Sequence, residues 1–152
     1  MGSWAAFEAE APELAARVRE RFGIRKHKTM ATLRRDGSPR ISGIECEFEE
    51  GELRFGVMPA SAKLRDLRRD PRVALHSPTD DPPDGSPASW RGEAKVAGRA
   101  VEEPFEAPPV PGAARFRVDL VEVVHTHLNA AGDRLVVDSW HAARGLQSLE
   151  RE

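Results

Sequence analysis

Two polar residues at the start of a short predicted helix have the right spacing to bind an anion. A helix is predicted over residues 62–69, directly after a strand. Ser61 comes just before this helix, and Lys63 lies in its first turn. The first N–H groups of a helix lack intrahelical partners and lie at the positive end of its dipole, so this position suits a phosphate. A capping serine beside a solvated lysine would give the same pattern. Walker-type glycine spacing is absent, so we do not expect a nucleoside triphosphate site.

Two of the five histidines are spaced to share one face of a strand. His125 and His127 are two residues apart in a predicted strand, so their side chains point to the same side and offer two ligands to a metal ion. The spacing shows no third ligand, and histidines that line a barrel or face solvent would give the same pattern. We therefore predict no metal site and leave the role of these histidines open.

No side chain is assigned a catalytic role from the sequence. The single cysteine, Cys46, lies between Glu45 and Glu47 in a predicted strand. The two neighbouring carboxylates would raise the pKa of its thiol, so we expect an inert residue rather than a nucleophile. The Gly-x-Ser-x-Gly motif of serine hydrolases is absent as well.

Hydrophobic spacing predicts the elements that position these residues. Residues 1–25 are predicted to form one N-terminal helix, because apolar residues recur every three or four positions from Phe7 to Phe22. Residues 26–140 alternate with period two or form short apolar runs, separated by turns rich in glycine, proline and aspartate. Residues 141–152 are predicted to be a polar tail.

The region 26–140 is predicted to hold six or seven short strands and one short helix. Strands are expected near residues 28–33, 41–48, 53–57, 72–75, 90–101, 116–128 and 135–140. A change of phase at Leu120 and Val121 indicates a bulge or bend in the longest of them. The helix ends at Asp70-Pro71, and we expect its arginines to form a solvated face balanced by Asp66 and Asp70. The predicted fold is mainly β: a single domain over residues 1–152, built as a small closed or nearly closed antiparallel barrel.

Composition excludes several classes of function. The chain has 152 residues and a net charge of -2, so it has no general positive field to bind nucleic acid. One cysteine allows no intrachain disulfide, which fits a cytoplasmic location. No apolar run approaches the roughly 20 residues of a membrane span, so we expect no membrane partner.

Five short segments, taken in order, carry a likeness to a known family. They are Ala31–Pro39 (ATLRRDGSP), Gly51–Phe55 (GELRF), Ser61–Lys63 (SAK), Asp70–Leu75 (DPRVAL) and Gly98–Ala100 (GRA). Together they resemble the pyridoxamine 5'-phosphate oxidase-like family of flavin-binding split β-barrels. The likeness covers roughly residues 26–140 and depends on the order and spacing of all five segments.

The resemblance implies a homodimer with two cofactor sites at the subunit interface. The cofactor would be FMN or, as in the deazaflavin-dependent relatives, coenzyme F-420, with FAD or haem in some members. In that family one strand lays its backbone along the cofactor ring, the next strand ends beside it, Ser-x-Lys holds the phosphate, and a C-terminal tryptophan closes the site from the neighbouring subunit. The residues that match these roles are Arg40, Ile41, Ser42, Gly43, Val57, Ser61, Lys63 and Trp140.

The sequence also departs from the true oxidases of the family. Glu45 stands where they have the lysine end of the second strand, and Glu93 matches a polar residue that contacts the ring. The segment 141–145 does not reproduce their substrate-binding pattern. We therefore expect a flavin- or deazaflavin-dependent oxidoreductase that exchanges hydride with a small organic substrate, and no oxidation of pyridoxamine phosphate. The alternative is a flavin or haem carrier without turnover, with His125 or His127 as the axial ligand of haem.

Overall fold

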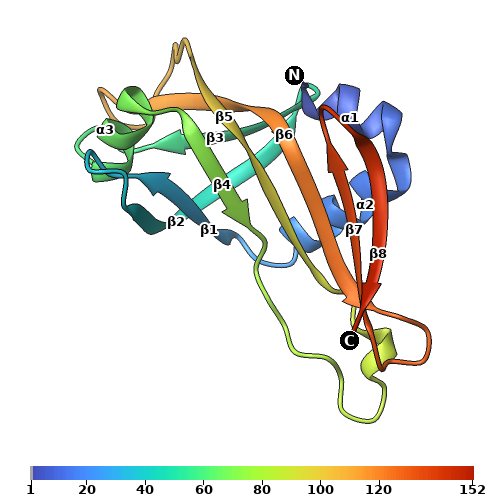
Figure 1. The fold of residues 1–152 in the computed structure, drawn as a ribbon. Helices are drawn as coiled ribbons and strands as arrows, with labels where there is room; N and C mark the ends of the chain where they lie inside the picture. Colours follow the sequence, from blue (N-terminus) through green and yellow to red (C-terminus); the bar gives the residue numbers. More distant parts are fainter. Residues whose placement is uncertain (1) are drawn as a thin grey trace.

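The protein is a mainly β barrel with additional strands and three α-helices, seen in a computed structural model that describes residues 2–152. One antiparallel sheet has the order β3-β2-β1-β4-β5-β6-β7-β8, and β3 also pairs with β6, so six strands close into the barrel (Figure 1). The strands are β1 His27–Leu33, β2 Pro39–Glu49, β3 Glu52–Val57, β4 Arg72–His76, β5 Glu93–Glu103, β6 Ala114–Leu128, β7 Leu135–His141 and β8 Gly145–Arg151. The mainly β antiparallel fold predicted from the sequence is confirmed.

Two helices pack at the N-terminus, where the sequence predicted one. They are α1 (Trp4–Glu10) and α2 (Pro12–Phe22), and the break falls at Ala11. Pro12 has no N–H to donate to the preceding turn and restricts the residue before it, so the first helix stops there and the second begins. The predicted apolar stripe is nevertheless buried throughout, from Phe7 to Phe22, because both helices turn it toward the barrel core.

The short helix between strands has the predicted boundaries. It is α3 (Ala62–Arg69), and Ser61 caps it by accepting a hydrogen bond from the backbone N–H of Leu64 at 3.4 Å. Pro71 prevents its continuation, and β4 follows at once. A single turn of 3-10 helix (Pro87–Ser89) is the only regular element in the loop between β4 and β5 within residues 2–152.

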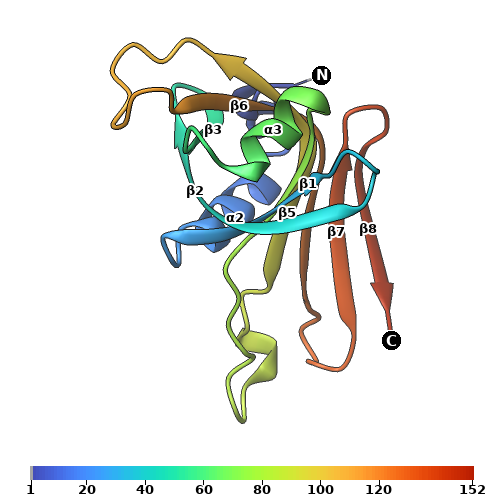
Figure 2. The same cartoon turned by 90° about the vertical axis from the view of Figure 1, so that its left-hand side faces the viewer.

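The C-terminal segment is a strand, so the predicted polar tail is wrong. Strand β8 pairs with β7 along its whole length, from Gly145 opposite His141 to Arg151 opposite Leu135. Its apolar residues, Leu146 and Leu149, are three positions apart, which is not the period of a strand. The neighbouring strand therefore decides its conformation, and Figure 2 shows β7 and β8 extending the sheet away from the barrel.

The change of phase in the longest strand is a β-bulge, as predicted. The pairing of β5 with β6 shifts between Ala97 and Gly98, which leaves Val121 as the additional residue on β6. A Cβ at Gly98 would lie 2.1 Å from the carbonyl oxygen of Asp119, so only glycine fits opposite the bulge. Among residues 2–152, no helix is long and apolar enough to cross a membrane.

Candidate functional site

The barrel opens where β2 and β3 separate. They pair only from Cys46 opposite Phe55 to Glu49 opposite Glu52. Beyond that point β3 continues alongside β6, while residues 39–45 of β2 pair with β1 alone. One backbone edge of this part of β2 therefore has no strand partner among residues 2–152, and its polar groups are open to a ligand.

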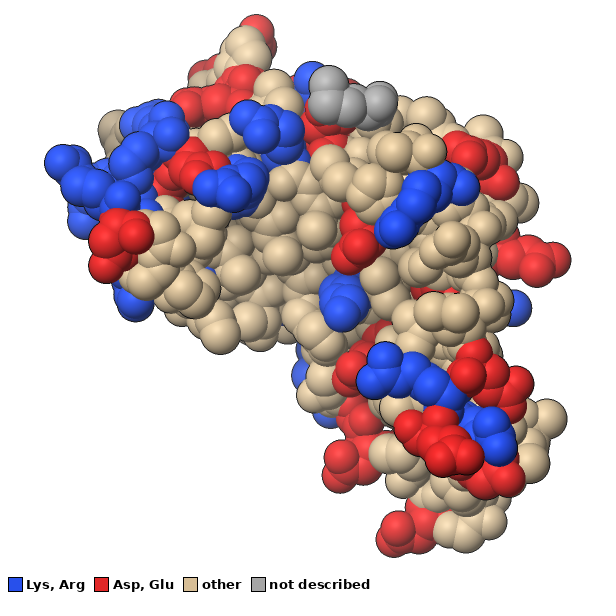
Figure 3. All heavy atoms as spheres, viewed as in Figure 1, with Lys and Arg blue, Asp and Glu red and all other residues tan. Residues whose placement is uncertain are grey.

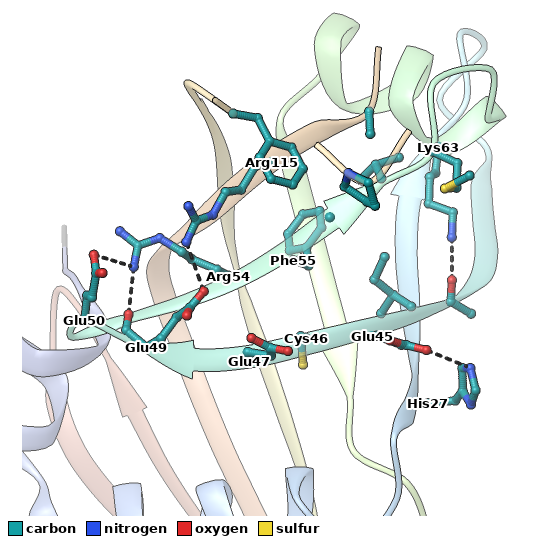
Figure 4. Close-up of a pocket in the computed structure, with 18 residues that line it drawn as sticks. His27, Glu45, Cys46, Glu47, Glu49, Glu50, Arg54, Phe55, Lys63 and Arg115 are labelled. Carbon is teal, nitrogen blue, oxygen red and sulfur yellow. Dashed lines mark hydrogen bonds and ion pairs between the residues drawn. The ribbon is translucent and has the colours of Figure 1, made fainter. Parts of the chain in front are cut away.

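A cavity of about 860 Å³ fills this opening, which is within the usual size range of small-molecule sites (Figure 4). Strands β2 and β3, the start of α3 and the loop before β6 enclose it. Its lining consists of His27, Gly43, Ile44, Glu45, Cys46, Glu47, Glu49, Glu50, Arg54, Phe55, Gly56, Val57, Met58, Lys63, Phe105, Pro109, Ala113 and Arg115.

Lys63 brings a positive charge to one end of the cavity. Its ammonium donates a hydrogen bond to the backbone carbonyl of Gly43 on the open edge of β2 (Figure 4). Partial burial lowers the pKa of Lys63 from its ordinary value, because the charged form loses solvent. An ammonium has three N–H donors, so Lys63 can keep Gly43 as a partner and still bind an anion.

Ser61 positions this lysine without lining the cavity. Its hydroxyl donates to the carbonyl of Met58 at 3.0 Å and caps α3, so the end of β3 and the start of the helix are held together. Lys63 consequently projects from the first helical turn toward β2. The structure thus brings Gly43, Val57, Ser61 and Lys63 close together, although Ser61 does not line the cavity and the side chain of Val57 is buried in the core.

The far side of the cavity is lined by paired acidic and basic side chains. Glu49 accepts a hydrogen bond from Arg115 at 2.9 Å, and Arg54 lies 3.7 Å from Glu50 (Figure 4). These ion pairs leave little free positive charge there. Lys63 is therefore the side chain best placed to receive a phosphate.

Three predicted residues of β2 have different surroundings from one another. Arg40 donates from Nε to Oδ2 of Asp66 at 2.7 Å, so its charge is engaged by α3 rather than free for a ligand. Ile41 is 74% exposed. The hydroxyl of Ser42 is buried without a hydrogen-bond partner in the described chain. None of the three lines the cavity, although they occupy the same open strand as Gly43.

Trp140 lies away from the others. It is 4% exposed and packs on Phe7 of α1 with ring centroids 5.0 Å apart, so its indole belongs to the hydrophobic core. The prediction that it closes the site from a neighbouring subunit does not agree with this position. The strand pattern at the end of the sequence suits either a core or a site tryptophan, and only the packing of α1 distinguishes them.

The thiol of Cys46 has a raised pKa, as expected, but chiefly for another reason. Burial raises the pKa of its thiol to about 11, with a smaller contribution from Glu47 that Lys28 opposes. The acidic neighbours on which the prediction relied point away from the core, because they alternate with Cys46 along β2.

Several residues of the cavity carry no signal in the sequence. His27, Met58, Phe105 and Arg115 come from four separate segments and meet only when the barrel closes. No motif spacing connects them. By contrast, Lys63 was identifiable because a helix start directly after a strand is a local pattern.

The comparison with known families supports the same class of protein. The family described as pyridoxamine 5'-phosphate oxidase matches residues 14–127, which is more than half of the chain. The chain therefore belongs to the pyridoxamine 5'-phosphate oxidase-like family of FMN-binding split barrels.

Solved structures share the fold at low sequence identity. A pyridoxamine 5'-phosphate oxidase-related, FMN binding protein from Nostoc punctiforme PCC 73102 is 15% identical, with a TM-score of 0.61 over 99% of this chain and 100% of that one. PhzG from Burkholderia lata 383 is 14% identical, with a TM-score of 0.62 over 98% and 88%. An F420 reductase is 17% identical, with a TM-score of 0.52 over 68% and 92%.

Proposed function

We propose that this chain is an oxidoreductase that binds FMN or coenzyme F-420 in the cavity between β2 and β3. The observation that carries the proposal is the partly desolvated Lys63 ammonium, held against the carbonyl of Gly43 on an unpaired strand edge. A phosphate suits the lysine, and the donors and acceptors of a flat heterocycle suit the strand edge. When bound, such a cofactor supplies hydride transfer to or from a small organic substrate.

The chain's own groups would bind and orient the cofactor. Lys63 and the first N–H groups of α3 would hold the phosphate, and Ser61 would keep that helical turn in place. The open edge of β2 at Gly43 would fix the plane of the ring by backbone hydrogen bonds. No acid or base in the described residues is required for a hydride step, so we assign none.

A homodimer is part of the proposal. Ala31, Ala74 and Ala97 lie opposite one another on β1, β4 and β5 and line an apolar surface hollow of about 430 Å³. Figure 3 shows an area with few charged side chains in the middle of the molecule, where Figure 1 places β4. Small side chains allow a second copy to approach closely, and a two-fold dimer would use this face twice.

Sedimentation velocity tests the dimer, with Ala74→Arg as the disrupting variant. We expect a dimer at micromolar concentration and a monomer for the variant, because an arginine would be desolvated without a partner in the interface. A wild-type chain that stays monomeric would remove the dimer from the proposal.

Ligand titration tests the cofactor. Purified protein is titrated with FMN, riboflavin and coenzyme F-420 while flavin fluorescence and the absorption spectrum are recorded. We expect one ligand per chain, and tighter binding of FMN than of riboflavin because only FMN carries the phosphate. A protein that binds none of the three contradicts the proposal.

The second candidate function is a carrier that binds flavin without turnover. A carrier needs no catalytic acid or base, and we assign none in this cavity, so the same cavity would also suit a carrier. Reduction of the bound cofactor by a nicotinamide nucleotide, followed by oxidation by an organic acceptor, distinguishes an enzyme from a carrier. The haem form of the carrier is disfavoured, because the ring of His125 is buried and stacked on His127.

A further inference from the structure

A group of potential metal ligands lies far from the cavity of Lys63. His125 and His127 on β6 and Asp138 on β7 each offer one ligand atom, and these atoms lie within 4.8 Å of one another. Figure 1 shows β6 and β7 meeting at the end of the molecule opposite α3. The sequence showed the two histidines but no third ligand, because Asp138 reaches them only through strand pairing.

The sheet brings the three side chains to one face. His125 and Asp138 lie directly opposite each other in the register of β6 and β7. Residues opposite each other in an antiparallel pair project to the same side, and His127 joins them because it is two residues from His125. The ring centroids of the two histidines are 4.9 Å apart.

His127 has two ring nitrogens that both face acceptors. Nδ1 lies 3.0 Å from the carbonyl oxygen of Leu128, and Nε2 lies 2.8 Å from Oδ2 of Asp138. A ring that donates from Nδ1–H to this carbonyl keeps its lone pair on Nε2, directed at the carboxylate of Asp138. A metal ion held by Nε2 and the carboxylate together would satisfy both electron pairs.

One ring nitrogen of His125 is free for a ligand. Its Nε2 donates to the carbonyl oxygen of Arg91 at 2.7 Å, which leaves Nδ1 as the nitrogen with a lone pair. Nδ1 has no hydrogen-bond partner among residues 2–152, and the side chain is only 4% exposed.

The carboxylate of Asp138 is held by groups that orient metal ligands. Ser148 on β8 donates to Oδ1 at 2.6 Å. Arg17 of α2 approaches Oδ2 at 3.4 Å, but its side chain is half exposed and free to turn into solvent when a cation binds. A surface hollow of about 420 Å³ borders Asp138, Ser148 and Arg17, so the carboxylate lies next to a space open to solvent.

We propose that His125, His127 and Asp138 bind a divalent transition metal ion with the preferences of zinc. Two imidazoles and one carboxylate form an established zinc ligand set, and an open fourth position takes water. Zinc at about 2.0 to 2.1 Å from each ligand places the donor atoms about 3.3 Å apart. The ligand atoms now lie up to 4.8 Å apart, and rotation of the side chains would bring them to this shorter separation.

Calorimetric titration with zinc chloride tests the proposal on the full-length protein after dialysis against a chelator. We expect one zinc ion per chain and at least about 100-fold weaker binding for His127→Gln and for Asp138→Asn, since each removes a direct ligand. His76→Gln is the matched control, because His76 lies 3.9 Å from Glu93 but has no third ligand. It should bind zinc as the wild type does.

A second measurement does not depend on the folding of variants. In a long-range ¹H–¹⁵N spectrum, zinc should shift the ring nitrogens of His125 and His127 together and leave those of His76 in place. If the wild type binds no zinc, or if both ligand substitutions leave binding unchanged, the metal site is refuted. Because Lys63 is remote from these residues, FMN binding is a separate result in either case.

Discussion

Arg40 on β2 donates a hydrogen bond from Nε to Oδ2 of Asp66 on α3 at 2.7 Å. Asp66 is buried, with 3% of its side chain exposed, and also accepts hydrogen bonds from Thr32 at 2.8 Å and Arg69 at 3.0 Å. The carboxylate thus ties the helix that carries Lys63 to β1 and β2, the strands beside the cavity. Arg40 therefore affects the site by positioning α3, although it does not line the cavity.

Replacement of Asp66 by alanine should destabilise the protein by about 2 to 3 kcal/mol, because it leaves buried donors without an acceptor. Chemical denaturation measures the change in the free energy of unfolding. The control is Glu102→Ala, which removes an exposed ion pair with Arg68 on the same helix and should cost less than about 1 kcal/mol. Equal losses of stability in the two variants would show that Asp66 is not the main contact holding α3 to β1 and β2.

Asp66 should also make stability depend on acid pH. Burial alone would raise the pKa of its carboxyl, but the hydrogen bonds from Arg40, Thr32 and Arg69 outweigh burial and hold the pKa below the ordinary value of 3.8. Its contribution is therefore present above pH 3.8 and lost as the pH falls below that value. Unfolding curves of the wild type and Asp66→Ala should converge in acid; a constant difference would contradict this account.

Replacement of Lys63 by alanine should weaken FMN binding about 10- to 150-fold, which corresponds to one charge-assisted hydrogen bond of about 1.5 to 3 kcal/mol. Riboflavin has no phosphate and should bind both proteins alike, as fluorescence titration would show. Arg65→Ala is the matched control, because Arg65 is an exposed cation on the same helix that does not line the cavity. An equal loss for FMN and riboflavin would indicate general damage rather than a phosphate contact.

Cys46 should resist alkylation in the native state and react only on unfolding, since its thiol has a pKa of about 11. The raised pKa means that the folded state binds this proton more tightly than the unfolded state, whose value is near 9.0. Stability should therefore be unaffected below about pH 9 and decline as the pH rises toward 11. Rapid modification of the folded protein by iodoacetamide at neutral pH would disprove the assignment.

Gly98→Ala should cost about 3 kcal/mol or more, because the added Cβ would lie 2.1 Å from the carbonyl of Asp119 and force the bulge to move. Gly43→Ala on β2 provides the control, since nothing lies within 4 Å of the position its Cβ would take. Thermal unfolding of the two variants should separate them clearly. Similar midpoints would mean that the bulge readily accommodates a side chain.

Local features of the fold were predictable from the sequence. The helix boundaries at Ser61 and Pro71 follow from capping and from the lost N–H of proline, both of which act within a few residues. The bulge in β6 was visible because an additional residue reverses the alternation of side chains. Lys63 was identified for the same reason, since its position depends only on the start of one helix.

Tertiary structure decided what depends on contacts between distant segments. Asp66 has the sequence pattern of a solvated helix face, yet Thr32 and Arg40 bury it because β1 and β2 pack beneath α3. Strand β8 has no strand period of its own and is ordered by pairing with β7. Asp138 meets His125 only through the register of that sheet. The spacing of apolar side chains predicts whether one segment is a helix or a strand. Burial and contacts between strands depend instead on which elements pack together.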